Sequence, residues 1–187
     1  MLIMENFQAV KNEKAYQLLN SGGLIIVCTV SSEGIYNMAP IAWHCPVDYD
    51  KTTRLLFVSD LQHKTYANII DTKKFVIALP SANQVEMVKE LGSCSGHKVN
   101  KIEHLHLSTF ESPVLKIALP LDCIAYLECN LHSVVMQETV GIVLGDVINA
   151  FGQKDAYKGR LLSENLNAKT IHHLGSNNFI TTADKLL

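Results

Sequence analysis

The sequence is short of charge, of aromatic residues and of long apolar runs, and each shortage excludes a class of protein. Charged residues make up 18% of the 187 residues, aromatic residues 7%, and the formal net charge is −2 at pH 7. Lys73-Lys74 is the only adjacent basic pair, so the basic stripe typical of nucleic-acid-binding proteins is missing. No apolar run approaches the roughly 20 residues that a membrane-spanning helix needs. We expect neither nucleic acid nor a membrane as a partner.

The cysteines are scattered along the chain, and their spacing is uninformative. The five cysteines are an odd number and contain no Cys-x-x-Cys pair. The first 14 residues mix charged and apolar types and carry no signal-peptide pattern. We therefore expect free thiols in a reducing cytoplasm. Because 48% of the residues are apolar, the composition predicts a folded protein, with residues 1–187 as one domain.

Hydrophobic patterning predicts a mainly β protein with a few attached helices. The continuous apolar run 24–30 predicts a buried strand, and the turn residues 31–34 predict a hairpin that returns through 37–43. Further strands are predicted at 54–59, 75–79, 120–131, 134–136 and 140–148. Many strands with few helices favour a closed antiparallel barrel with helices attached.

Two helices are predicted from their N-terminal signals. Ser59 and Gln62 match a capping box in front of residues 63–72, and a second box at 81–84 opens a helix through residue 91. The next polar stretch, 93–100, is predicted to be a loop.

Further segments are predicted from composition alone. Residues 45–53 contain Pro46 and two aspartates and predict a loop. The final forty residues are polar and predict little regular structure. Gly141 and Gly145 fall inside a predicted strand, so we expect a bulge or a close approach at each.

The stretch 37–43, Asn-Met-Ala-Pro-Ile-Ala-Trp, combines a strand with groups that suit a flat ligand. Pro40 has no N–H for a neighbouring strand, so the ladder is expected to end there and leave nearby backbone groups for other partners. The Asn37 amide both donates and accepts, and Trp43, the only tryptophan, adds a large ring. By itself, the stretch favours a bulged hairpin with a packed tryptophan.

A second candidate site is the start of the helix predicted at 63–72. A helix N-terminus presents unpaired N–H groups and a positive dipole end, which together suit an anion. Ser59, Lys64 and Thr65 would add hydroxyls and a cation where a phosphate would lie, and Lys101 could add a second charge. The alternative is a capped helix with two solvated lysines.

Together these pieces resemble the flavin reductase-like family, and within it the flavoredoxin-type branch. The resemblance runs from Gly22 to Val147 and rests on the order and spacing of several motifs. They are Asn37-x-Ala39-Pro40-x-x-Trp43, Ser59 with Lys64-Thr65-x-x-Asn68-Ile69, Phe75-Val76-x-x-Leu79-Pro80, and Ser95-Gly96 with Lys101. The resemblance implies an FMN-binding split β-barrel, antiparallel and of Greek-key type. It also implies a homodimer with FMN near the subunit interface.

The resemblance further implies roles for single residues. Asn37 corresponds to an asparagine beside the flavin, Trp43 to an aromatic near the ring, and Phe179 to an aromatic that covers it. The backbone of residues 38–42 would line the edge of the isoalloxazine. The cofactor-binding residues expected in this way are Asn37, Met38, Ala39, Pro40, Ile41, Ala42, Trp43, Ser59, Lys64, Thr65, Asn68, Lys101 and Phe179.

The implied activity is that of an NAD(P)H-dependent flavin oxidoreductase. A hydride from NADH or NADPH would reach bound FMN, and electrons would pass to an acceptor that the sequence does not identify. No catalytic side chain is expected, because the cofactor carries the chemistry. Many family members have a histidine where this chain has Val140, and His132 is several residues out of register. This departure favours a different role, that of a non-catalytic FMN electron carrier reduced by a protein partner.

A metal site and a cofactor-free barrel have less support from the sequence. A metal site is not expected, because His104-x-His106 and His172-His173 lack a usual zinc spacing. Cys94 and His97, in the polar loop, are predicted to be incidental. The fourth possibility is a barrel that has lost its cofactor and only binds partners, and the presence of Asn37, Thr65 and Lys101 together argues against it.

Overall fold

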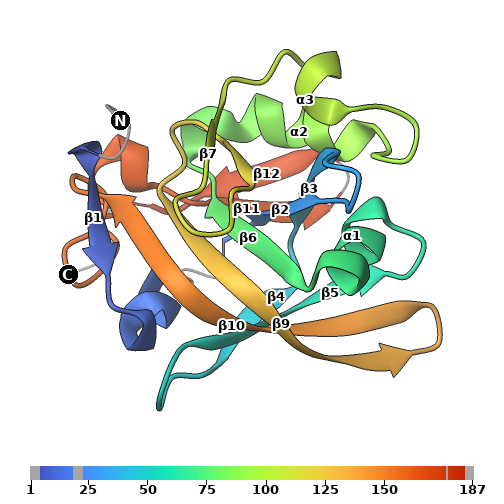
Figure 1. Ribbon diagram of the computed structural model, residues 1–187. Helices are drawn as coiled ribbons and strands as arrows, with labels where there is room; N and C mark the ends of the chain where they lie inside the picture. Colours follow the sequence, from blue (N-terminus) through green and yellow to red (C-terminus); the bar gives the residue numbers. More distant parts are fainter. Residues whose placement is uncertain (1–4, 19–22, 176, 184–187) are drawn as a thin grey trace.

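The structure, a computed structural model, describes residues 5–18, 23–175 and 177–183 (Figure 1). The strands are β1 (Phe7–Val10), β2 (Ile25–Val30), β3 (Tyr36–Ile41), β4 (His44–Asp48), β5 (Arg54–Asp60), β6 (Lys74–Leu79), β7 (Thr109–Glu111), β8 (Ala118–Pro120), β9 (Ala125–Gln137), β10 (Val140–Gln153), β11 (Ile171–Gly175) and β12 (Asn178–Thr181). The α-helices are α1 (Lys64–Thr72), α2 (Val85–Ser93) and α3 (Lys101–His104), and 3-10 helices span Asn12–Leu18, Ala82–Gln84 and Leu166–Ala168. Within these described ranges, every helix is too short or too polar to cross a membrane.

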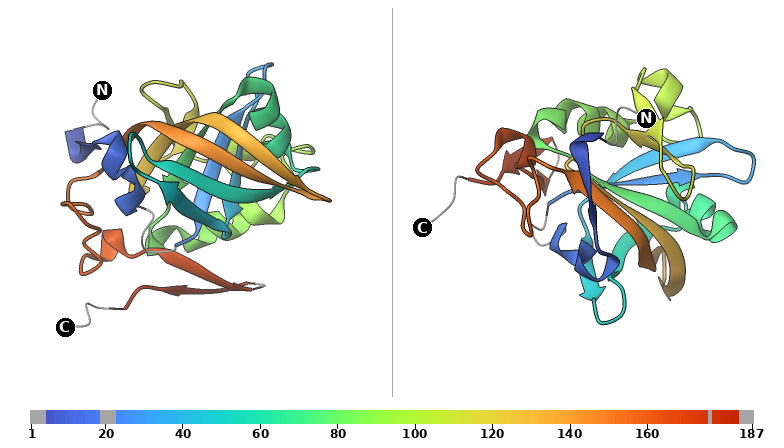
Figure 2. Two further views of the ribbon diagram at one scale, coloured as in Figure 1. Left: turned by 90° about the horizontal axis from the view of Figure 1, so that it is seen from below. Right: turned by 60° about the vertical axis from the view of Figure 1, so that its left-hand side comes forward.

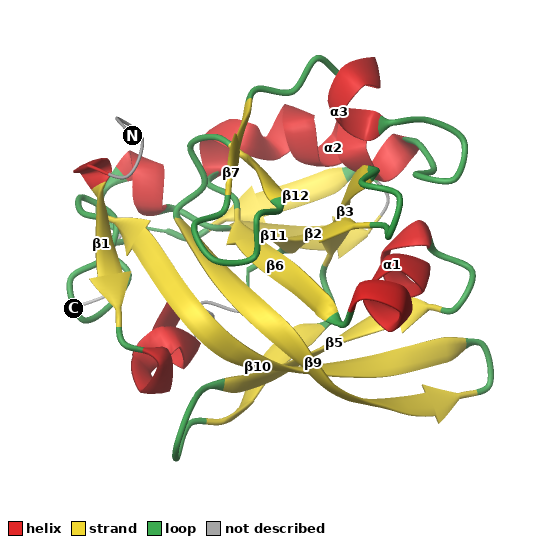
Figure 3. Ribbon diagram, in the orientation of Figure 1, coloured by secondary structure: helices red, strands yellow, loops and turns green. Residues whose placement is uncertain are grey.

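One antiparallel sheet forms the body of the protein. Its strands follow the order β3-β2-β6-β9-β10-β5-β4, and β1 pairs with the far end of β10. β3 and β4 stand at opposite ends of this order, yet only Ala42 and Trp43 separate them in the chain. The sheet therefore curls until its two edges approach each other at this link (Figures 1 and 3). The predicted antiparallel barrel with attached helices is confirmed, and its split lies between β3 and β4.

The alternation of side chains along β2 builds two cores. Ile25 and Val27 point into the barrel, where Phe57 and Phe75 meet edge to face with ring centroids 5.3 Å apart. Ile26 points the other way, into a second core that includes side chains of α2. Because both faces of β2 are covered, its sequence is a continuous apolar run instead of an alternating one. The strand predicted at 24–30 is confirmed.

The hairpin of β2 and β3 is also confirmed. Its turn closes where Gly34, with φ of +82°, donates its N–H to the Ser31 carbonyl at 3.0 Å. β3 is an edge strand, the position in a sheet that tolerates proline. The pairing with β2 continues one residue beyond Pro40, to Ile41, so the ladder ends slightly later than predicted.

Gly145 is the close approach that its sequence context predicts. The register of β10 against β9 shifts between Leu144 and Gly145. A Cβ on Gly145 would lie 2.3 Å from Cζ of Phe75, so any side chain here would displace an aromatic ring of the barrel core. Gly141 is similar, because its Cβ would lie 2.7 Å from the Tyr66 ring.

Two predictions of loop structure are wrong. Residues 45–53 do not form a continuous loop, because β4 occupies His44–Asp48 at the edge of the sheet. An edge strand accommodates Pro46, so proline does not mark a turn at this position. The last forty residues contain the β11–β12 hairpin, which Figure 2 shows beside the barrel and apart from the main sheet.

The two predicted capping boxes have different outcomes. At Ser81, the backbone N–H donates to Oε1 of Gln84 at 3.0 Å, so this box is confirmed. The box predicted at Ser59 and Gln62 is wrong. The N-cap of α1 is His63, so Ser59 lies too far before the helix to cap it. The N–H of Gln62 instead donates to the Asp60 carboxylate at 2.8 Å.

Candidate functional site

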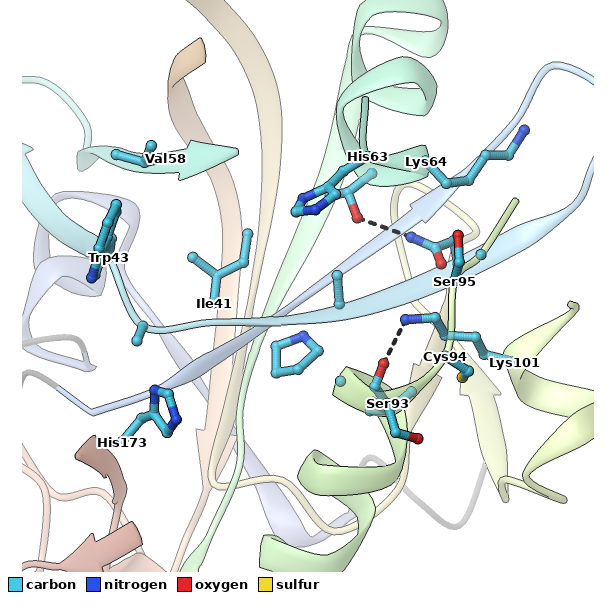
Figure 4. A pocket seen from close by; sticks show the side chains of 18 residues that line it. Ile41, Trp43, Val58, His63, Lys64, Ser93, Cys94, Ser95, Lys101 and His173 are labelled. Atoms are coloured by element: carbon cyan, nitrogen blue, oxygen red, sulfur yellow. Dashed lines mark hydrogen bonds between the residues drawn. The ribbon is translucent and has the colours of Figure 1, made fainter. Parts of the chain in front are cut away.

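A pocket of about 690 Å³ lies at the split of the barrel. α1, α2 and α3 all contact β3, which crosses the pocket as its floor. Figure 4 shows His63 and Lys64 at one end of the pocket and Trp43 and His173 at the other, with Ile41 between them. The pocket is therefore elongated, with a helix start at one end and the link between the two sheet edges at the other.

Most of the residues expected from the sequence line this pocket. They are Asn37, Ala39, Pro40, Ile41, Ala42, Trp43, Lys64, Thr65 and Lys101. Segments from strand β3, helix α1 and helix α3 thus meet in one cavity, although up to 64 positions separate them along the chain, the distance from Asn37 to Lys101.

Four expected residues do not line the pocket. The Met38 side chain is fully buried in the core beneath α2, although its backbone lies on β3. Ser59 and Asn68 are buried behind the pocket wall. Phe179 lines a smaller chamber that adjoins the pocket.

Asn37 is held in place by neighbours on two elements. Its Nδ2 donates to Oγ1 of Thr65 at 2.9 Å, which ties β3 to the first turn of α1. Behind it, Nδ2 of Asn68 donates to Oγ1 of Thr29 at 3.0 Å, and the Thr29 hydroxyl donates to the Asn37 carbonyl at 3.4 Å. Asn68 therefore supports Asn37 from inside the protein and does not face the cavity.

The other end of the Asn37 side chain is unsatisfied. Its Oδ1 is buried and has no hydrogen-bond partner among the described residues. Gly96 packs so closely over it that a Cβ on Gly96 would lie 2.1 Å from Oδ1. A buried acceptor without a donor costs about 1–3 kcal/mol, so this atom marks a place where a bound molecule could contribute a donor.

The start of α1 is prepared for an anion. His63 occupies the N-cap position but its side chain makes no capping hydrogen bond. The first backbone bond of the helix runs from the Ala67 N–H to the His63 carbonyl at 3.2 Å. The N–H groups of the first turn before Ala67 have no acceptor within the helix, and Lys64 adds a cation beside them. This end of the pocket therefore suits a phosphate.

Lys101 brings a second cation to the pocket wall. The residue is only 4% exposed, and its Nζ donates to the Leu91 carbonyl at 2.6 Å. Burial lowers the pKa of the Lys101 ammonium, while the neighbouring Cys94 thiol acts in the opposite direction. Because its partner is a neutral carbonyl, an anion in the pocket would compensate for the desolvation of this charge.

Several residues that line the pocket are not predicted by the sequence motifs. They are Val58, His63, Leu91, Gly92, Ser93, Cys94 and His173, whereas Ser95 and Gly96, which also line the pocket, belong to a quoted motif. His63 and the loop residues adjoin the motifs, so extending each motif by a few positions finds them. Val58 and His173 carry no such signal, because only the curl of the sheet and the β11–β12 hairpin bring them to the site.

Within the described residues, no three His, Cys, Asp or Glu side chains gather where they could hold a metal ion. His132, several residues out of register with the family histidine, lies outside the pocket. Its Nδ1 is 3.0 Å from the Asp146 carboxylate, which also pairs with Arg54.

Sequence comparison then decides the family. Residues 19–172, most of the chain, match the profile of the flavin reductase like domain. The chain belongs to the flavin reductase-like family. This flavin reductase-like protein is 26% identical to the uncharacterized protein YddH of Escherichia coli K12, over 98% of both chains.

Solved structures share the fold of this protein. An FMN-binding domain of a flavin reductases-like enzyme from Shewanella baltica OS155 has a TM-score of 0.86 and 24% identity, with 97% of each chain covered. A flavoredoxin from Methanosarcina acetivorans has a TM-score of 0.76 and 18% identity, with 88% of this chain and 86% of that chain covered. The split-barrel fold of this flavin reductase-like protein is thus confirmed.

Proposed function

We propose that this protein binds FMN in the pocket at the split of the barrel and acts as an NAD(P)H-dependent flavin oxidoreductase. The observation that carries the proposal is the pairing of two unlike ends in one cavity: an uncapped helix start and the edge of a sheet. The first suits a phosphate and the second suits a flat ring with polar edges. Structural neighbours that bind FMN support the choice of this cofactor.

The residues present fit FMN in size and chemistry. The cavity of about 690 Å³ lies within the roughly 300–1,000 Å³ range of small-ligand sites. Lys64 and the first turn of α1 would hold the phosphate, with Lys101 as a second cation nearby. The unsatisfied Oδ1 of Asn37 requires a hydrogen-bond donor, which a polyol chain or a ring N–H supplies.

The residues of the chain would bind the cofactor, orient it and shield it from water. The N–H groups of Ala39 and Ile41 belong to the ladder with β2, so the backbone N–H groups of Ala42 and Trp43, beyond that ladder, would donate to the polar edge of the ring and stabilise negative charge there. Apolar side chains of Ile41 and Val58 would exclude water from its face. When bound, FMN supplies the electron-transfer chemistry, and no side chain needs to act as an acid or a base.

We also propose a homodimer with the pocket near its interface. Trp43 is 72% exposed at the mouth of the pocket. On the adjoining outer face of the barrel, Leu56 and Val58 of β5 lie directly opposite Leu144 and Ile142 of β10, and all four are only partly buried. A second copy would cover this apolar face.

A cytoplasmic location completes the proposal. The five cysteines are free thiols. Free thiols in this number suit a reducing compartment.

A second candidate function is an FMN electron carrier that a protein partner reduces. The observation that favours it is Val140, at the start of β10, where many family members have a histidine. Val140 pairs with Asp60 of β5, just before α1, so this position adjoins the phosphate end of the site.

A visible spectrum of the purified protein, followed by addition of each nicotinamide, tests both functions. We expect flavin absorbance bands, or their appearance when FMN is added to the colourless protein. Protein that stays colourless and binds no FMN on titration would overturn both functions. Anaerobic stopped-flow mixing with NADH and NADPH then separates the two, because an electron carrier would be bleached by neither.

A further inference from the structure

A side chamber of about 290 Å³ adjoins the main pocket, between α2 and the β11–β12 hairpin. Leu24, Val88 and Phe179 form its apolar walls. It shares Pro40, Ala42, Gly92, Ser93 and His173 with the main pocket. The two cavities therefore adjoin each other at the end of β3, where the proposed flavin ring would lie.

We infer that this side chamber binds a planar, single-ring aromatic molecule that carries an oxygen acceptor such as a carboxylate. The inference rests on the proposed function for the role of that molecule, a second substrate beside the flavin. The binding itself is a property of the chain's own residues, which set the walls, the size and the polar rim of the chamber.

The walls of the chamber suit an aromatic ring. The ring of Phe179 lies 5.1 Å from that of His173, centroid to centroid, at an interplanar angle of 40°. This is the separation that aromatic pairs prefer, about 4.5–7 Å, and because both rings line the chamber they offer an aromatic wall to a further ring. Leu24 and Val88, at 4% and 1% exposure, belong to the core beneath α2 and give the opposite wall a fixed shape.

The size of the chamber limits its occupant to one ring with a substituent. An apolar cavity of about 150 Å³ holds a benzene molecule. The side chamber has about twice that volume, and lies just below the roughly 300–1,000 Å³ of sites for drug-sized ligands. A dinucleotide would not fit within it.

The polar rim supplies a partner for an oxygen acceptor. Lys89 lines the chamber, and its ammonium now pairs with Glu86 at 2.8 Å. The Glu86 side chain is 76% exposed, so this surface pair contributes little and can be exchanged for a ligand carboxylate. Asn177, also in the lining, adds an amide that can donate.

The end of α2 does not oppose a negative charge here. Its last carbonyl groups are already engaged by donors of the chain. The Glu90 carbonyl accepts from Ser93 Oγ at 2.8 Å and from Cys94 Sγ at 3.5 Å, and the Leu91 carbonyl accepts from Lys101. The partial negative charge of the helix end is therefore partly neutralised on the side of the chamber.

Titration calorimetry with benzoate, on protein without FMN and on protein loaded with FMN, tests the inference. Cyclohexanecarboxylate, which has the same charge but no planar ring, is the matched probe. We expect benzoate to bind to both forms and cyclohexanecarboxylate to bind several-fold more weakly. Equal affinities for the two probes, or no benzoate binding to either form, would overturn the inference.

Two variants locate the binding. Phe179→Leu should weaken benzoate binding by about fivefold through loss of the ring contact, and Lys89→Gln by about threefold through loss of the charge. Ile180→Ala, at a 52% exposed position on the same strand, is the control for damage to the hairpin and should change the affinity less than either. Unchanged benzoate affinity in both Phe179→Leu and Lys89→Gln would place the binding elsewhere.

The two proposals fail separately. If the protein binds benzoate with this pattern but binds no FMN, the inference about the chamber stands and the proposed function is overturned. If it binds FMN but not benzoate, the proposed function stands and the inference about the chamber is overturned.

Discussion

Replacement of Gly96 by alanine tests how the polar loop and Asn37 fit together. The new methyl group would lie 2.1 Å from Oδ1 of Asn37 and 2.8 Å from its Cγ. Asn37 cannot turn away freely, because its Nδ2 is bonded to Thr65 and its carbonyl accepts from Thr29. Either the loop lifts from β3 or the Asn37–Thr65 hydrogen bond breaks, and both outcomes disturb the pocket.

The magnitude follows from the bond that must be lost. A broken hydrogen bond with a buried group left unpaired costs about 1–3 kcal/mol. If this cost falls on the FMN-binding conformation, the affinity of Gly96→Ala for FMN should fall by roughly 5- to 150-fold. Quenching of flavin fluorescence during titration of the protein into FMN measures the change.

A matched control and a second variant make the test specific. Gly152→Ala adds the same methyl group at a site away from the pocket, where its nearest atoms lie at 3.5 Å, an ordinary contact. This control should bind FMN as the parent does. In an Asn37→Ala background, Gly96→Ala should lose most of its effect, because the clashing amide is gone. Additive effects in the double variant, or parental affinity in Gly96→Ala alone, would refute the reasoning.

Two further predictions concern the cysteines and an ion pair. With Ellman's reagent, Cys45, which is exposed, and Cys94, which is half-buried, should react in the native protein, and bound FMN should protect Cys94, a lining residue of the pocket. The buried thiols should react only after denaturation, since burial raises the pKa of Cys123, for example, to about 12; rapid reaction of all five would contradict the packing. The second prediction rests on Asp146, whose pKa is lowered chiefly by the hydrogen bond from Arg54. A folded-state pKa below the unfolded value stabilises the fold above the unfolded pKa, and the contribution is lost as pH falls through the folded pKa. Asp146→Asn should therefore lower the urea midpoint at pH 7, and its difference from the parent should shrink as the pH falls below the unfolded value of about 3.9, whereas a difference independent of pH would count against the ion pair.

The central strands could be predicted from sequence because their burial pattern is local. β2 and β6 are apolar on both faces, and their short length, their β-branched residues and the flanking turn signals favour a buried strand over a buried helix. The edge strand β4 and the β11–β12 hairpin could not be predicted in the same way. Their residues are mostly exposed, so polar composition and Pro46 hid their pairing.

The residues of the pocket could be predicted where they belong to one continuous motif, because such a motif fixes both their identity and their relative positions. Asn37 to Trp43 and the start of α1 are such motifs, and they meet as expected. The sequence did not predict which side chains face the cavity and which are buried behind its wall. On β5 the alternation of side chains turns Val58 toward the pocket and Ser59 inward. On α1, Asn68 shares the buried face of Thr65 but lies one turn further from the helix start.

The most direct test of the central claim compares FMN with riboflavin, which has the same ring but no phosphate. If α1 holds the phosphate while β3 lines the ring, FMN should bind roughly 30-fold or more tightly than riboflavin. Lys64→Gln should lower the ratio of the two affinities, because it weakens the binding of FMN and leaves the binding of riboflavin unchanged. Equal affinity for the two flavins, or failure to bind either, would contradict the claim that one cavity binds both the phosphate and the ring of a flavin nucleotide.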